Sequence, residues 1–232
     1  GIIQRRVIDA LQRDPPPVAW IGPREGNPAS LRAYRLYRWL LERGYRFHEA
    51  DGYQFLVRAD RADHLGLGVE SDRDRAELRR IFAPTDLGRL PQAWGRALGN
   101  PESRFRPLPA SLAAGPIDPA LRTEDPTRVW RLNTPIRGRD ADFAAIHVSC
   151  GRALSDPIIA QALWSSDAEA WTPEHSLTFR LAAGELLLPM GAHPDWLRGE
   201  GIARLAVRVD RAIVSRCGTV RVGPPRLLRL TD

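Results

Sequence analysis

Residues 36–58 read LYRWLLERGYRFHEADGYQFLVR: a helical pattern, a glycine, and two alternating runs joined by Asp51-Gly52. An Asp-Gly pair between two alternating runs is a strong short-range signal for a two-residue type I′ hairpin. The helix is expected to end at Gly44, since glycine readily adopts the left-handed backbone of a helix C-terminus. The cross-strand pairs that follow from a two-residue loop are Tyr45–Arg58, Arg46–Val57, Phe47–Leu56 and His48–Phe55.

The helix before this hairpin has two distinct faces when residues 31–43 are placed 100° apart. The apolar arc, which has to pack on a core, holds Ala33, Tyr34, Leu36, Tyr37, Leu40 and Leu41. The other arc holds Arg32, Arg35, Arg38, Trp39, Glu42 and Arg43. Guanidinium groups bind phosphates and an exposed indole stacks on bases, so this arc can bind nucleic acid. The other interpretation is a solvated face with local ion pairs.

The order of helix, short strand, helical segment and hairpin is similar to a winged helix. The residues that carry the resemblance are VIDAL (7–11), VAWIG (18–22), LRAYRLYRWLLERGY (31–45) and RFHEADGYQFLVR (46–58). In that family the helix before the hairpin enters the DNA major groove, and the wing contacts phosphates or the minor groove. The resemblance implies that Arg46, Arg58 and Arg61 extend the basic helix face onto the wing.

Composition divides the chain into three regions and predicts an α+β protein. Residues 1–83 are mostly helical with the hairpin, and residues 71–82 form a helix capped by Ser71. Residues 84–127 are rich in proline and predict an irregular connector. Residues 128–232 predict a mostly β domain, with a short helix around DPIIAQALW (156–164) and a strand in which Arg204 and Arg208 share a face.

The charge of the chain permits an anionic partner without requiring one. All 34 basic residues are arginine, and the net charge is +6. No apolar run is long enough to cross a membrane, and the N-terminal segment lacks the apolar stretch of a signal peptide. We therefore expect a cytoplasmic protein with no membrane partner. If the apolar cluster Leu186-Leu187-Leu188 lies at a sheet edge, it can serve protein partners or self-association.

The two cysteines are expected to be buried and reduced, and no metal or cofactor motif is present. Two stretches nevertheless invite a catalytic interpretation, AAIHVSCG (144–151) and RAIVSRCGT (211–219). This order, with a histidine after one strand and a cysteine after a later strand, resembles that of caspase-like cysteine peptidases. The resemblance implies that His147 is a general base and Cys217 a thiolate nucleophile.

The leading functional prediction is a basic, non-enzymatic nucleic-acid-binding protein, a subunit of a replication, regulatory or defence assembly. It depends on the arginine face of residues 31–43, and it leaves DNA and RNA equally open. The alternatives are a protein-interaction scaffold and a cysteine hydrolase that uses His147 and Cys217.

Overall fold

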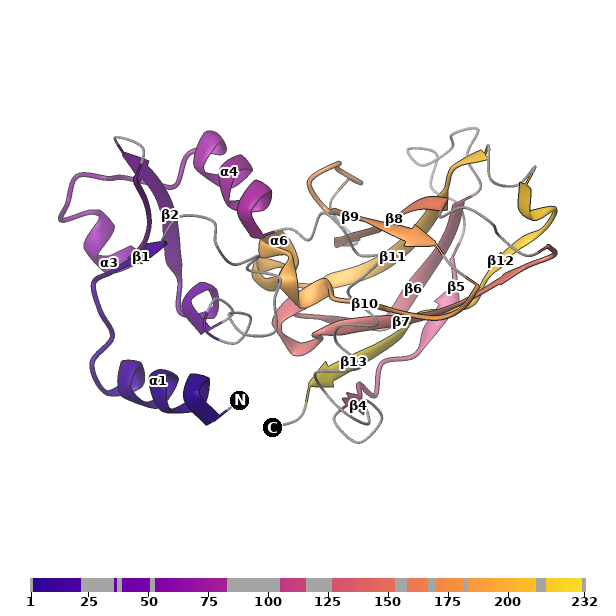
Figure 1. Ribbon diagram of the computed structural model, residues 1–232, viewed down its shortest axis with the longest axis horizontal. Helices are drawn as coiled ribbons and strands as arrows, with labels where there is room; N and C mark the ends of the chain where they lie inside the picture. The colour runs from indigo at the N-terminus through magenta and orange to yellow at the C-terminus, as the bar shows by residue number, and fades with distance from the viewer. Residues whose placement is uncertain are drawn as a thin grey trace. The chain divides into compact units, whose positions relative to one another are not determined.

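The computed structural model describes residues 2–21, 36, 39–50, 53–82, 105–115, 127–152, 158–166, 170–181, 183–211 and 216–230. The chain forms two compact units (Figure 1). The first comprises residues 1–83 with 192–198, and the second comprises residues 84–191 with 199–232. Both helices and strands are present and strands predominate, so the broad α+β prediction is confirmed.

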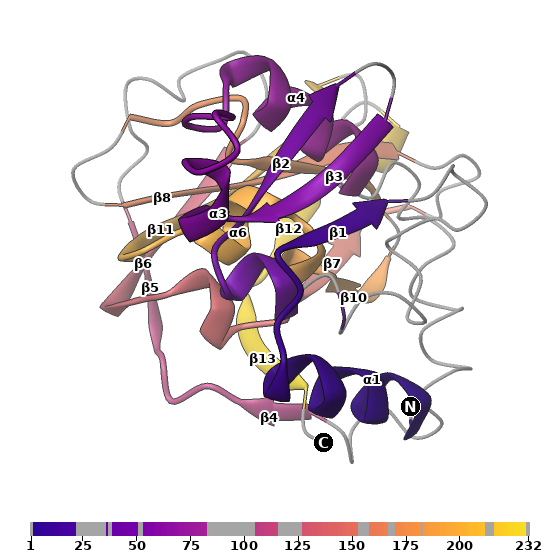
Figure 2. The same ribbon diagram turned by 90° about the vertical axis from the view of Figure 1, so that its left-hand side faces the viewer.

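A three-stranded antiparallel sheet organises the first unit (Figure 2). The elements of the unit are α1 (Ile2–Arg13), β1 (Val18–Ile21), β2 (Tyr45–Ala50), β3 (Tyr53–Arg58), α3 (Ala59–Ala62), α4 (Asp72–Phe82) and α6 (Pro194–Arg198). The strand order is β1-β3-β2. Strands β2 and β3 form the predicted hairpin, and all four predicted cross-strand pairs are present. The tip of the hairpin, Asp51-Gly52, lies outside the described residues.

Helix α4 begins and ends near the positions that the sequence predicts. In α4, Ser71 Oγ accepts a hydrogen bond from the backbone N–H of Asp74 at 3.1 Å. The Asp74 carboxylate in turn accepts one from the backbone N–H of Ser71, also at 3.1 Å. This reciprocal pair is a capping box, which confirms Ser71 as the cap. Among the described residues, no helix is long and apolar enough to span a bilayer.

The first unit has its own hydrophobic core, to which a remote segment contributes. Tyr45 and Phe47 are two residues apart on β2, so their side chains share one face of the sheet. Leu197 joins them from α6, far along the chain. The buried members of this cluster are Trp39, Leu40, Leu41, Tyr45, Phe47, Leu56, Leu78 and Leu197.

The second unit is built from two five-stranded antiparallel sheets. Its strands are β4 (Phe105–Pro107), β5 (Leu112–Ala114), β6 (Thr127–Ile136), β7 (Phe143–Cys150), β8 (Ile158–Ser166), β9 (Ser176–Leu181), β10 (Gly184–Leu188), β11 (Ile202–Val209), β12 (Val220–Val222) and β13 (Arg226–Leu230). The described residues also form the 3-10 turns η3 (Gly138–Asp140) and η4 (Met190–Ala192). One sheet has the order β5-β6-β11-β8-β9, and the other has the order β10-β7-β13-β4 with β12 paired to β7 (Figure 1).

The strands β8 and β11 have one fully buried face and one face that carries polar side chains. On the buried face, Trp164 lies opposite Leu205. On the other face, Gln161 lies opposite Arg208. The short helix predicted around DPIIAQALW is therefore wrong, because residues 158–166 form a strand. Exposed Ile159 beside buried Ala160 shows the alternation of a strand, which the small alanines obscure in the sequence.

The proline-rich stretch supplies short strands to the second unit. Within its described part, β4 and β5 each stand at the end of a sheet order. Pro107 lies in β4, consistent with the rule that proline is tolerated at a sheet edge because it donates no ladder hydrogen bond. Strand β10 also stands at the end of its sheet order. The side chains of Leu186 and Leu188 are nevertheless buried, so they belong to the core.

A disulfide joins Cys150, at the end of β7, to Cys217, just before β12. The prediction of two reduced cysteines is therefore wrong. Their Cα atoms are 5.3 Å apart, a usual separation for a disulfide, although the two positions are 67 residues apart in the sequence. A side chain at Gly151 would place its Cβ 3.2 Å from the carbonyl oxygen of Cys217, so glycine permits this close approach.

Candidate functional site

Trp39 is part of the core of the first unit, contrary to its predicted place on the exposed arc. Only 7% of its surface is accessible, and its ring lies 6.3 Å from that of Tyr45. The guanidinium of Arg43 covers the ring at 5.2 Å from its centroid. This is a cation–π contact within one helix end, and an indole covered in this way cannot stack on a base. The remaining helix arginines, Arg32, Arg35 and Arg38, lie outside the described residues.

The arginines next to the hairpin each have a carboxylate partner. Arg58 donates from Nε and Nη2 to the two oxygens of Asp60, at 2.6 and 2.9 Å. Arg61 Nε lies 3.9 Å from the same carboxylate. Arg46 Nη1 lies 3.9 Å from Asp63. These are the local ion pairs of a solvated face, and they reduce the positive charge that Arg46, Arg58 and Arg61 present to a phosphate.

Hydrogen bonding between Arg58 and Asp60 also affects how the two groups titrate. The bond from Arg58 lowers the pKa of Asp60 below its ordinary value of 3.8, and it raises the pKa of Arg58. Both groups therefore keep their charges, and their partnership, at neutral pH.

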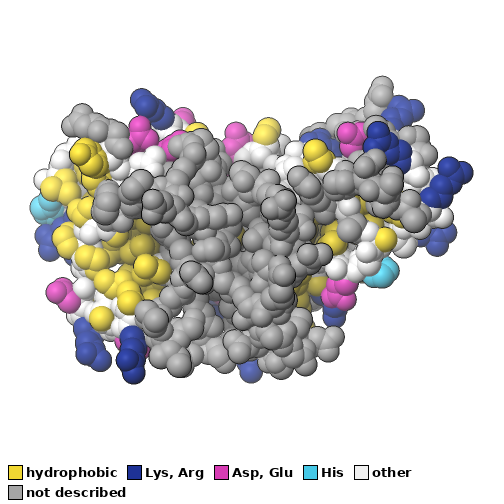
Figure 3. Space-filling model, viewed as in Figure 1, with side chains coloured by type: hydrophobic (Ala, Val, Ile, Leu, Met, Phe, Trp, Pro, Cys, Tyr) yellow, Lys and Arg dark blue, Asp and Glu magenta, His cyan; other side chains and the backbone are white. Residues whose placement is uncertain are grey.

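On the face shown in Figure 3, several arginine side chains gather around the β12 end of the second unit, and others are spread over the first unit. Exposed arginines near that end include Arg152, Arg216 and Arg221.

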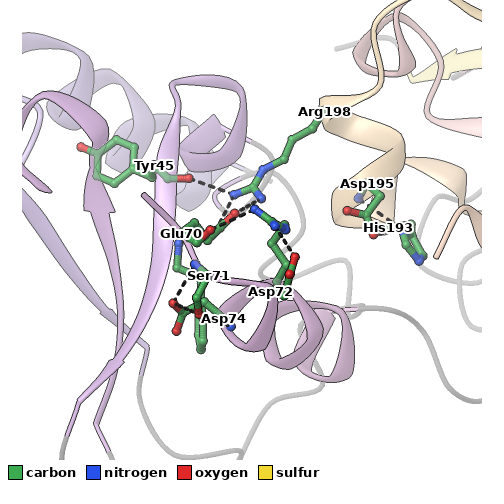
Figure 4. A network of polar contacts seen from close by, with 10 residues as sticks. Tyr45, Glu70, Ser71, Asp72, Asp74, His193, Asp195 and Arg198 are labelled. Carbon is green, nitrogen blue, oxygen red and sulfur yellow. Dashed lines mark hydrogen bonds and ion pairs between the residues drawn. The ribbon is translucent and has the colours of Figure 1, made fainter. Parts of the chain in front are cut away.

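The second polar cluster of the first unit centres on Glu70 (Figure 4). Its buried carboxylate accepts hydrogen bonds from Arg198 Nη1 at 2.6 Å and Arg198 Nη2 at 3.1 Å. The backbone N–H of Phe47 donates to the same carboxylate at 2.7 Å, and Arg198 Nη2 donates to the carbonyl of Tyr45 at 3.2 Å. These contacts join α6, β2 and the segment just before α4, so we assign this cluster a structural role.

The geometry removes the basis for a cysteine hydrolase. Cys217 is fully buried and forms the disulfide, so it has no thiolate to act as a nucleophile. His147 is exposed on β7, three residues before Cys150, and side chains three apart on a strand point to opposite faces. His147 therefore points away from the disulfide. Its cross-strand neighbour is Glu185 on β10.

A groove of about 260 Å³ lies on the polar face of β8 and β11 in the second unit. The described residues that line it are Ile159, Ala160, Gln161, Arg208 and Asp210. Arg208 donates from Nε to Gln161 Oε1 at 3.1 Å, and its Nη2 donates to the same oxygen. The amide thus holds the guanidinium in place without neutralising its charge. The groove brings together a cation, an amide, a carboxylate and the exposed side chain of Ile159.

An aromatic side chain stands beside the groove on the same sheet face. Trp171 packs against Leu163 and Ala206, which form the cross-strand pair next to Gln161 and Arg208. The guanidinium of Arg204 lies 5.0 Å from the Trp171 ring centroid and donates to the carbonyl of Ser166. The face therefore continues from the polar groove to a half-buried indole.

The sequence contained only part of the signal for this groove. The alternation that places Arg204 and Arg208 on one face was visible. Gln161 was hidden in a segment predicted to be helical, and it lies 47 residues before Arg208. Only the pairing of β8 with β11 brings the two together.

Comparison with known proteins does not assign a function to this site. No protein-family model and no curated protein matches the sequence. Among the described residues, no three His, Cys, Asp or Glu side chains are grouped so that they could hold a metal ion.

Proposed function

We propose that this chain is a non-enzymatic binding protein, with its ligand site in the groove on β8 and β11. The observation that carries the proposal is the convergence of Gln161, Arg208 and Asp210 in one groove on the sheet. A concave site with a few converging polar groups and some apolar surface is the usual form of a binding site.

The test is NMR titration of the ¹⁵N-labelled protein with a panel of small ligands. The panel comprises neutral sugars, inorganic phosphate, an acidic sugar, an amino sugar and short peptides. We expect at least one class to shift the backbone amides of residues 159–161 and 208–210. The Arg208→Ala variant should weaken that response, whereas Arg221→Ala on β12, an exposed arginine of the other sheet, should not. A panel in which no ligand shifts these amides would contradict the proposal.

Nucleic-acid binding by the first unit is the second candidate. The observation that favours it is the strand order β1-β3-β2, with β1 after a helix and β2 and β3 forming a hairpin, since this order agrees with a winged helix. The basic residues for this role are Arg32, Arg35, Arg38 and Arg43, with Arg46, Arg58 and Arg61 on the wing. Because each wing arginine lies beside a carboxylate, these three residues contribute less positive charge to such a site than the helix arginines.

Fluorescence anisotropy with labelled duplex DNA and single-stranded RNA tests this candidate. Phosphate contacts release counterions, so binding should weaken steeply between about 50 and 200 mM salt. Replacing Arg32, Arg35 and Arg38 together with alanine should flatten that salt dependence. The matched control replaces Arg152, Arg216 and Arg221 instead. Affinity that is absent, or equal in the two triple variants, would count against the first unit as a nucleic-acid site.

We also infer that the chain folds in an oxidising compartment rather than in the cytoplasm predicted from its N-terminal segment. Disulfides persist in oxidising compartments and are rare in cytosolic proteins. Alkylation of the freshly isolated protein, followed by mass spectrometry, tests this directly. The inference predicts that Cys150 and Cys217 take up the reagent only after reduction. Uptake before reduction would favour the cytoplasm.

A further inference from the structure

We propose that the first unit pairs with a second copy of this chain through strand β1, so that the two sheets form one continuous antiparallel sheet. This inference does not depend on the groove of the second unit. Strand β1 stands at the end of the order β1-β3-β2 and, among the described residues, pairs with β3 alone. Its sequence, VAWI, contains neither a charged residue nor a proline. An edge strand without these protections can pair with another chain.

The register of β1 with β3 shows which backbone groups face outward. The N–H of Arg58 donates to the carbonyl of Pro17 at 3.0 Å, so Pro17 and, by alternation, Ala19 direct their backbone groups toward β3. The N–H and C=O groups of Val18 and Trp20 therefore point away from the sheet. Outside the sheet ladder, no backbone hydrogen bond among the described residues involves Val18. The outer edge of β1 thus offers donors and acceptors to another strand.

The opposite edge of the same sheet, strand β2, is occupied by side chains. The backbone N–H of Phe47 donates to the buried carboxylate of Glu70 at 2.7 Å. The carbonyl of Tyr45 accepts a hydrogen bond from Arg198 at 3.2 Å. An incoming strand would have to displace this buried ion pair, so β1 is the edge of the sheet that is open to pairing.

The strands at the ends of the second unit's sheets have features that discourage pairing. Strands β4 and β5 are only three residues long, and β4 contains Pro107. Strand β10 carries the exposed charge of Glu185, and β9 exposes Thr178 while its leucines are buried. Short length, proline and charge are the usual means by which an edge strand avoids pairing. Strand β1 is therefore a better candidate for association than these edges.

Apolar side chains are exposed on β1 and on the helix that precedes it. Val18 is 39% exposed, and Val7 of α1 is exposed to a similar extent. Figure 3 shows hydrophobic side chains gathered over the part of the first unit that holds β1 and α1. Exposed apolar surface of this kind marks sites of protein–protein contact. Pairing at the edge would remove part of it from water.

The geometry of the edge identifies a second copy as its partner. When two β1 strands pair antiparallel about Ala19, Val18 of each copy lies opposite Trp20 of the other, and each such pair exchanges both of its hydrogen bonds. Pairing about Val18 instead would use Pro16, which has no N–H and whose carbonyl already accepts from the Tyr45 hydroxyl at 2.6 Å. The register about Ala19 is self-complementary, and such an interface closes at a dimer.

Cysteine cross-linking of the full-length chain tests this register. In it, the two Ala19 residues form a non-hydrogen-bonded pair with Cα atoms about 4.5 Å apart, within the range for a disulfide. Under mild oxidation, Ala19→Cys should therefore form a covalent dimer on a non-reducing gel. Pro17→Cys is the control, since the two Pro17 residues would be roughly 13 Å or more apart. Equal cross-linking of the two variants would overturn the proposed pairing.

Sedimentation velocity over about a hundredfold range of protein concentration measures the dimer without a cross-link. Val18→Lys should raise the dimer Kd about tenfold or more, because it brings a charge into the interface. Val69→Lys, at another exposed valine of the first unit, should leave the Kd within twofold. Val18→Pro removes the outward N–H without removing a donor to β3, so it should also weaken the dimer while the unit stays folded. Circular dichroism establishes that each variant is folded.

The remaining outcomes decide against a second copy at β1. A chain that stays monomeric at every concentration, together with no covalent dimer from Ala19→Cys, would overturn the proposal. A dimer that survives both Val18→Lys and Val18→Pro would belong to another surface and would overturn it as well. A dimer that Val69→Lys weakens as much as Val18→Lys does would not be specific to β1. None of these results bears on the groove of the second unit.

Discussion

The two units hold sequence-distant segments in place by different chemistry. In the first unit, an ion pair between Glu70 and Arg198, 128 residues apart, ties α6 to the segment before α4. In the second unit, a disulfide between Cys150 and Cys217 ties the end of β7 to the segment before β12. The ion pair depends on burial and on accurate hydrogen bonding, and the disulfide depends on the redox conditions. Conditions that loosen one unit should therefore leave the other intact.

The two units also use arginine differently. Beside the hairpin, Arg58 is paired with the carboxylate of Asp60, two residues away. On β11, Arg208 bonds to the neutral amide of Gln161 from another strand. The first arrangement offsets the positive charge locally, whereas the second orients the guanidinium without offsetting its charge. This difference is why the groove, rather than the hairpin, is the leading candidate site.

The largest expected effect comes from breaking the disulfide. Replacing Cys150 and Cys217 with serine should lower the free energy of unfolding of the second unit by about 4 kcal/mol, because the unfolded chain loses a loop closure of this length. Urea denaturation followed by circular dichroism measures the change. Reductant should reproduce it in the unchanged protein, and Ser149→Ala, at the exposed position next to Cys150, should not. An equal loss of stability in the first unit would contradict the view that the disulfide stabilises the second unit alone.

Breaking the Glu70–Arg198 pair should be the next largest effect. Arg198→Ala leaves the Glu70 carboxylate buried without its cation, and we expect the first unit to lose about 3 kcal/mol. The double variant Glu70→Gln, Arg198→Met should lose less, since it leaves no unpaired buried charge. Hydrogen exchange of the β2 and β3 amides measures the change unit by unit.

The matched control for Arg198 is the exposed pair of Arg139 with Glu200 in the second unit, at 2.9 Å. Arg139→Ala should cost at most about 1 kcal/mol, because both side chains are well solvated. A similar loss for Arg139→Ala and Arg198→Ala would show that burial does not distinguish the two ion pairs.

A smaller effect is expected from removing a local contact in the first unit. Ser71→Ala removes the hydroxyl that caps α4 and should cost about 1 kcal/mol. Ser71→Asp, which can also cap a helix, should retain most of the stability. The same hydrogen-exchange measurement on α4 checks both variants. If Ser71→Ala destabilises the first unit as much as Arg198→Ala does, local and remote contacts do not differ in their contribution to its stability.

The smallest effect concerns the pH dependence of the hairpin region. Since Arg58 lowers the pKa of Asp60 in the folded protein, the ionised pair stabilises the first unit above the ordinary value of 3.8. This contribution is lost as the pH falls below that value and through the lower folded pKa. Arg58→Ala should return the pKa of Asp60 toward 3.8, as measured by NMR titration of its carboxyl carbon. An unchanged pKa in the variant would mean that the hydrogen bond to Arg58 is not its cause.

Features set by neighbours in the sequence were predictable. The Asp51-Gly52 signal predicted the register of β2 and β3, and Ser71 predicted the start of α4. The helical wheel was less successful at Trp39, because the wheel separates polar from apolar arcs but does not show which large side chain the core takes up. The helix predicted at residues 156–164 failed for a related reason, since alternating alanines resemble either element until a partner strand is present.

The sequence by itself therefore determined the local structure: the hairpin, the helix ends and the predominance of strands after residue 128. Turn chemistry, capping and alternation act over a few residues, so they can be inferred from the chain alone. Tertiary structure decided the disulfide, the recruitment of α6 into the first unit, and the meeting of Gln161 with Arg208. Each of these joins groups that are 47 to 128 residues apart. Their contact depends on how the strands and helices pair and pack, and no local pattern specifies that pairing.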